Sequence, residues 1–150
     1  MKIIFLGTTG VHHSLIAAYV YLQRLPDRDF KMIPGFSDIK KDDSGFPLFI
    51  DEDSLGNQVY TLGAGREVLM AQKTIGDLVN VLGFSNEDLV VKPVRIKGEQ
   101  LLLMLEKISN ILGGESISLL LSNYIVQKEF HRILKEVENF RLETKKLHLH

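Results

Sequence analysis

Residues 7–14 combine small residues, two histidines and hydroxyl groups in the order Gly-Thr-Thr-Gly-Val-His-His-Ser. The segment follows an apolar run, Ile3 to Leu6, and precedes a stretch with helical spacing of apolar residues. Glycines permit a tight turn and let a ligand approach the backbone. The next helix points its unpaired N–H groups and positive dipole end at the same place. The pattern predicts a phosphate-binding loop, with these ligand-binding residues: Gly7, Thr8, Thr9, Gly10 and Ser14.

His12 and His13 are the candidate catalytic residues. Histidine serves as a general acid, a general base or a phosphate acceptor near neutral pH. A helix N-terminus lowers the pKa of a nearby histidine, so we expect a neutral imidazole, which suits a base better than a charge clamp. The alternative is structural, with one histidine packed on the sheet and the other solvated. The residues leave open whether the protein is an enzyme, and they require no cofactor or metal.

A second glycine turn, Gly63-Ala64-Gly65-Arg66, also joins a predicted strand to a predicted helix. Gly63, Gly65 and Arg66 are therefore predicted to line the same edge of the sheet. An arginine in the first helical turn opposes the helix dipole unless an anion is nearby. Its guanidinium offers a fork of N–H groups that fits phosphate. An exposed arginine paired with Glu67 or another acid is the alternative.

The first turn resembles a degenerate P-loop of the form G-x-x-G-x-G-K-[ST]. Gly7, Gly10 and Ser14 match, whereas His12 and His13 replace the inner glycine and the lysine. The lysine neutralises terminal phosphates, and a histidine is only partly charged near neutral pH. The pattern therefore favours binding of a phosphorylated small molecule or nucleotide over nucleotide hydrolysis. The sequence contains no basic patch interleaved with aromatic residues, so we do not expect the protein to bind nucleic acid.

Composition limits the protein class. The 150 residues are 45% hydrophobic and 25% charged, with a net charge of -1, which predicts a single globular domain over 1–150. The absence of cysteine excludes disulfides and thiolate metal sites. The first apolar run stops at Gly7, too early for a signal peptide or membrane span, so we expect a cytoplasmic protein without a membrane partner.

Strands and helices are predicted to alternate along the chain. Such alternation indicates a three-layer α/β fold, Rossmann-like or P-loop-like, with a mostly parallel sheet and helices on both faces. Turn residues in 51–57 predict one β-hairpin insertion, whereas 29–45 is expected to be a loop and 141–150 a polar, frayed tail. The expected strands are 3–6, 47–50, 58–62, 89–94 and 117–121, and the expected helices are 14–25, 66–82, 99–112 and 124–140.

Two apolar runs, Leu101 to Leu105 and Leu119 to Leu121, favour a second interpretation. Consecutive apolar residues on a helix face more than one direction, so one side is available to a partner. The alternative function is a non-catalytic interaction or regulatory protein that forms a homo-oligomer.

The opening of the chain also resembles a family of short Gram-positive bacterial proteins of unknown function. In that family a first strand leads into a G-x-H-x-S turn and an alanine-rich helix, and the segment from Gly56 to Tyr60 and Arg66 resemble further parts of it. The resemblance implies no activity and draws attention to His12 and Ser14. The residues that match the opening pattern are Gly10, His12, Ser14, Ala17 and Ala18.

Overall fold

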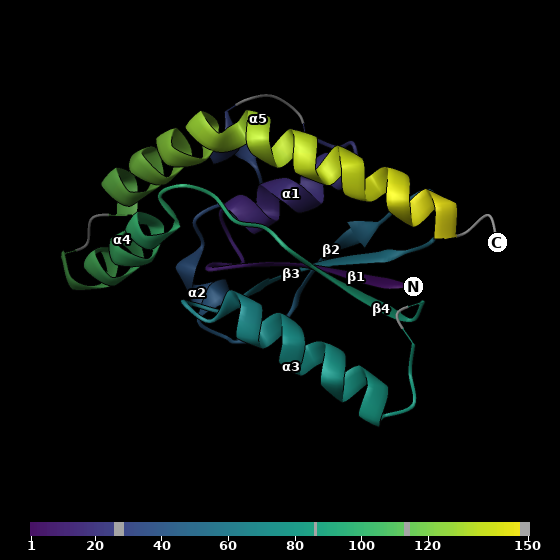
Figure 1. Cartoon of the computed structure of the whole chain (residues 1–150). Helices are drawn as coiled ribbons and strands as arrows, with labels where there is room; N and C mark the ends of the chain where they lie inside the picture. Colours follow the sequence, from purple (N-terminus) through teal and green to yellow (C-terminus); the bar gives the residue numbers. More distant parts are fainter. Residues whose placement is uncertain (26–28, 86, 113–114, 148–150) are drawn as a thin grey trace.

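The structure, a computed structural model, describes residues 1–25, 29–85, 87–112 and 115–147 (Figure 1). It is a mixed α/β fold built on one four-stranded sheet. No helix in these ranges is both long enough and apolar enough to cross a membrane. The strands are β1 (Lys2–Gly7), β2 (Leu48–Glu52), β3 (Gln58–Gly63) and β4 (Leu89–Pro93). The helices are α1 (His13–Tyr21), the 3-10 helix η1 (Phe30–Met32), α2 (Ile39–Asp42), α3 (Val68–Val81), α4 (Glu99–Leu112) and α5 (Glu115–Leu147).

The sheet has the spatial order β2-β3-β1-β4 and is mixed. Strand β1 lies parallel to both β3 and β4, whereas β2 lies antiparallel to β3. The prediction of a mostly parallel sheet is therefore wrong. The short turn after β2 returns the chain directly alongside it, which only an antiparallel pair allows. The predicted β-hairpin is confirmed.

The predicted strand at Ile117–Leu121 is also wrong, because these residues belong to α5. A short apolar run fits a buried strand and a helix equally well. The continuation of the segment decides the matter, since the buried positions Ser122, Val126 and Ile133 repeat at the spacing of a helix. The helix continues through Leu147, and Thr144 in the expected tail is buried. Three of the predictions fall outside the described residues. They are the helix end at Pro26, the helix end at Gly113–Gly114, and the tail residues 148–150, which include His148 and His150.

Helices cover both faces of the sheet, as Figure 1 shows. Helices α1 and α5 lie on one face and α3 lies on the other. Phe5 in the central strand packs against Tyr21 of α1 and Phe140 of α5, with ring centroids 5.6 and 5.9 Å away. Side chains alternate along a strand, so Ile3 and Phe5 share this face. This packing fixes α1 on the face of the sheet. It therefore places the turn that precedes α1 at the carboxyl edge of the sheet.

Candidate functional site

The two predicted glycine turns meet at the carboxyl edge of the sheet. Gly7 and Gly63 are register partners in β1 and β3. Ala64 N donates to Gly7 O at 2.9 Å, and Gly65 N donates to Thr8 O at 3.0 Å. Parallel strands end at the same edge, which is where ligands bind in open α/β sheets. The structure thus brings together the predicted residues Gly7, Thr8, Thr9, Gly10, Gly63 and Gly65.

Gly10 and Gly63 approach each other too closely for any side chain, and we call this pair the glycine cradle. A Cβ atom on Gly63 would lie 2.9 Å from Gly10 N and 2.6 Å from Oδ1 of Asp42. A Cβ atom on Gly10 would lie 2.7 Å from the same carboxylate oxygen. Gly10 N donates to Asp42 Oδ1 at 2.7 Å. An oxygen of the protein's own carboxylate therefore occupies the position predicted for an anion.

The Asp42 carboxylate is held with little electrostatic compensation. Burial raises its pKa, the hydrogen bond from Gly10 lowers it, and the charge of neighbouring Asp43 raises it again. Lys41 on the same short helix pairs with Asp38 at 3.5 Å, and among the described residues Asp42 forms no ion pair. One backbone N–H thus offsets only part of the cost of desolvating the carboxylate, and the pKa of Asp42 stays raised.

Residues 36–42 cover the first turn, and we call them the flap. Ser37 N donates to Val11 O at 2.9 Å, and Ser37 Oγ lies 3.2 Å from Nε2 of His12. The ring of Phe36 stands edge-on to His12 with centroids 5.6 Å apart. Ser37 adopts a left-handed φ of 62°, a conformation that stores strain in a residue other than glycine. The flap is therefore tied to the turn at several points, one of them strained.

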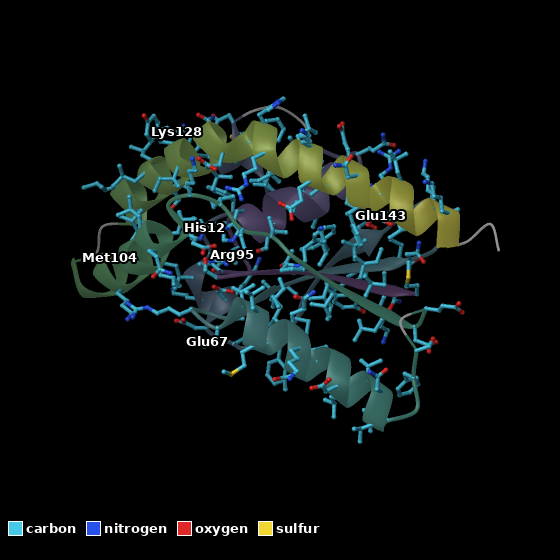
Figure 2. The ribbon with its side chains drawn as sticks, in the orientation of Figure 1. His12, Glu67, Arg95, Met104, Lys128 and Glu143 are labelled. Carbon is cyan, nitrogen blue, oxygen red and sulfur yellow. The ribbon has the colours of Figure 1, made fainter. Side chains whose placement is uncertain are left out.

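His12 and His13 are both buried, and Figure 2 shows His12 at the start of α1. Thr9 Oγ1 lies 2.8 Å from His12 Nδ1. Burial, followed by the charge of His13, lowers the pKa of His12 to about 3. Burial lowers the pKa of His13 to about 4, against a raising contribution from the Val94 backbone. Both imidazoles are therefore neutral at pH 7, mainly through burial rather than through the helix dipole.

Ser14 and Arg66 have different surroundings. Ser14 is buried, and its hydroxyl donates to Thr9 O at 2.5 Å, which closes the turn internally. Arg66 is exposed, lies just ahead of α3, and forms no ion pair with Glu67 or any other described residue. Thr8 Oγ1 is buried without a hydrogen-bond partner in the described part of the chain. No three His, Asp or Glu side chains within that part are grouped to hold a metal ion.

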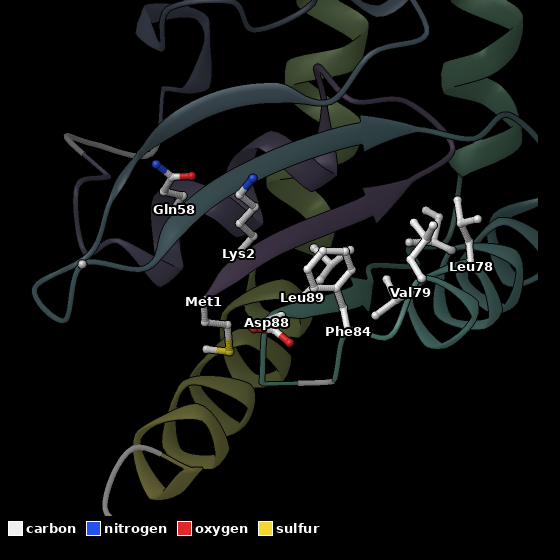
Figure 3. A pocket seen from close by; sticks show the side chains of 11 residues that line it. Met1, Lys2, Gln58, Leu78, Val79, Phe84, Asp88 and Leu89 are labelled. Atoms are coloured by element: carbon white, nitrogen blue, oxygen red, sulfur yellow. The ribbon is translucent and has the colours of Figure 1, made fainter.

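A separate groove of about 560 Å³ lies at the opposite edge of the sheet (Figure 3). Leu78 and Val79 of α3 line it together with Leu82, Phe84 and Leu89. It lies at the amino ends of β1, β3 and β4, whereas the glycine cradle lies beyond their carboxyl ends. Its shape depends on how α3 sits on the sheet, and the sequence pattern gave no signal for it.

Sequence reasoning missed Asp42 and Ser37. Residues 29–45 have no periodicity, and the charges at 40–43 are typical of a loop surface. The contact between Asp42 and Gly10 spans 32 residues, so no local spacing indicates it. The one available signal was the length of the loop, because long loops in compact domains are often functional.

The fold and its turn define the class: an α/β protein whose central strand passes through a glycine turn into a buried helix. The chain belongs to DUF3189, a family of proteins of unknown function, whose model matches residues 2–142. No curated protein and no solved structure matches the chain. The resemblance to an uncharacterised family is thereby confirmed, and membership assigns no activity.

Proposed function

We propose that the protein binds a phosphorylated small molecule or nucleotide at the glycine cradle, and that Asp42 occupies the cradle when the ligand is absent. The observation behind this proposal is the hydrogen bond from Gly10 N to the Asp42 carboxylate at 2.7 Å. A phosphate oxygen and a carboxylate oxygen seek the same backbone donor. The backbone that receives Asp42 is therefore suited to a phosphate that takes its place.

The free energy needed to displace Asp42 is small enough for a weakly binding ligand to supply. A hydrogen bond to a charged group contributes about 1.5–3 kcal/mol, and burial of the carboxylate reduces that gain. The left-handed Ser37 in the flap adds strain that release would relieve. The hydrogen bond alone would weaken ligand binding by about 10- to 150-fold, at 1.4 kcal/mol per factor of ten, and burial and strain lower that factor.

Other groups at the same edge suit a phosphate ligand. Arg66 is exposed and without an ion pair among the described residues, so its guanidinium is available to a second phosphate oxygen. Movement of the flap would separate His12 Nε2 from Ser37 Oγ, now 3.2 Å apart. A neutral imidazole would then face the ligand as an acid, a base or a hydrogen-bond partner. Binding of the ligand does not depend on this role of His12, so catalysis would be a separate, later step.

Removal of the competing carboxylate is expected to tighten phosphate binding. In Asp42→Ser the cradle is vacated, so inorganic phosphate or pyrophosphate should bind more tightly than to the unchanged protein, by up to about 150-fold. Calorimetric titration measures the difference, with circular dichroism to verify folding. Asp43→Ser is the matched control, because it removes the same charge one residue away, where the side chain is exposed and Gly10 N does not donate to it. Equal phosphate affinities for folded Asp42→Ser and Asp43→Ser would refute the proposal.

A further inference from the structure

The two halves of α5 differ in charge. No charged residue occurs from Ser116 to Gln127, whereas charged residues recur from Lys128 to Lys146. In Figure 1 the carboxyl-terminal half lies over α1 and the sheet, and the amino-terminal half extends beyond the sheet edge beside α4. Exposed helix surfaces normally carry many charged residues. The uncharged half of α5 therefore has a composition suited to contact with protein.

One face of this half is apolar and uncovered. Ile117, Leu120, Leu121 and Tyr124, which we call the apolar stripe, repeat at the spacing of a single helix face. Their exposed fractions lie between 44% and 66%. The buried positions described on the same half are instead Ser118, Ser122, Asn123, Ile125 and Val126. The helix thus has one face packed in the molecule and a second apolar face directed to solvent.

We propose that the apolar stripe forms the interface of a homodimer, in which α5 of one copy packs against α5 of a second copy. A two-fold interface uses the same patch on both subunits and must be self-complementary. An apolar stripe without charges meets that requirement, and it offers no charge with which to select a charged partner.

The available area also fits a dimer. Leu101 and Met104 on α4 are likewise exposed. Taking roughly 200 Å² for a whole large side chain, the exposed fractions of these two residues and the stripe correspond to about 700 Å² of apolar surface on two neighbouring helices. A standard interface buries about 800 Å² on each partner. The groove beside α3 is less suited to self-association, because the charged residues Lys2 and Asp88 line it and removing charged groups from water is costly.

Sedimentation equilibrium of the full chain tests the interface. We expect a dimer on the order of 10 µM protein. The double variant Leu120→Glu/Tyr124→Glu should raise the dissociation constant about 100-fold or more while circular dichroism stays unchanged, because buried aromatic and apolar anchors dominate such interfaces. Leu142→Glu is the matched control: Leu142 is 61% exposed on the same helix but outside the stripe, so this variant should remain dimeric.

Two results would overturn the inference. One is a monomer at several times the concentration expected for dimerisation, including a monomer that instead sediments with lipid vesicles. The other is a dimer that survives the double variant but dissociates in Leu82→Glu, which alters the groove beside α3. Should the double variant fail to fold, Ile117→Glu at the end of the stripe replaces it, with the same expected dissociation. Because phosphate binding is measured in a separate experiment, refuting the homodimer would not refute phosphate binding at the cradle, and the reverse also holds.

Discussion

Acidification from pH 7 to about pH 4.5 is expected to lower the free energy of unfolding by as much as about 5 kcal/mol, because each buried histidine contributes about 1.4 kcal/mol per pH unit. The pKa of His12 is about 3 and that of His13 about 4 in the folded protein, against 6.5 when unfolded. The unfolded chain therefore takes up protons first. The stability conferred by the neutral imidazoles is complete above pH 6.5 and is lost as the pH falls below it. The raised pKa of Asp42 acts in the opposite direction.

Urea unfolding at a series of pH values between 7 and 4.5 measures this slope. His12→Gln removes one of the two groups, so the loss of stability per pH unit should fall by about half. His131→Gln is the control, because His131 is exposed on α5, and its slope should match that of the unchanged protein. An undiminished slope in His12→Gln would show that this imidazole does not remain neutral and buried.

Gly63→Ala is expected to reduce the free energy of unfolding by about 1–3 kcal/mol, the usual range for overpacked sites. The added Cβ atom would lie 2.9 Å from Gly10 N, which is backbone and cannot rotate away. It would also lie 2.6 Å from Asp42 Oδ1, so the flap should lose its hold on the cradle.

Gly76→Ala provides the comparison. Gly76 lies within α3, and nothing lies within 4 Å of a Cβ atom placed there. Alanine favours the helix over glycine by about 0.5–1 kcal/mol, so this variant should be slightly more stable than the unchanged protein. Urea unfolding of both variants decides the question, and equal stabilities would mean that the close approach at Gly63 has no energetic consequence.

Local patterns predicted much of the fold. The apolar run before Gly7, the turn residues in 51–57 and the spacing in 99–112 each act over a few residues, and β1, the β2–β3 hairpin and α4 appear where expected. The errors concern information that is not local. The run Ile117–Leu121 suits a strand or a helix until its neighbours are packed. The direction of an edge strand depends on which strand it pairs with.

Only part of the candidate site could likewise be predicted from local sequence patterns. The meeting of the Gly7 and Gly63 turns follows from two parallel strands ending together, so the sequence could predict it. The positions of Asp42 and Ser37 could not be predicted, because a loop without periodicity carries them back over the turn. The burial of His12 follows from that same flap rather than from any property of the segment 7–14.

The backbone amide of Gly10 reports most directly on whether phosphate takes the place of Asp42. In ¹⁵N NMR of the full chain, added inorganic phosphate should shift the Gly10 resonance to saturation, at lower concentration in Asp42→Ser than in the unchanged protein. Two controls separate specific binding from an effect of salt. The Gly76 resonance, which is remote from the cradle, should not shift, and chloride added to the same ionic strength should not shift the Gly10 resonance. A Gly10 resonance that phosphate leaves unmoved in both folded proteins would contradict the proposal, because the cradle would then bind no external anion even without the Asp42 carboxylate.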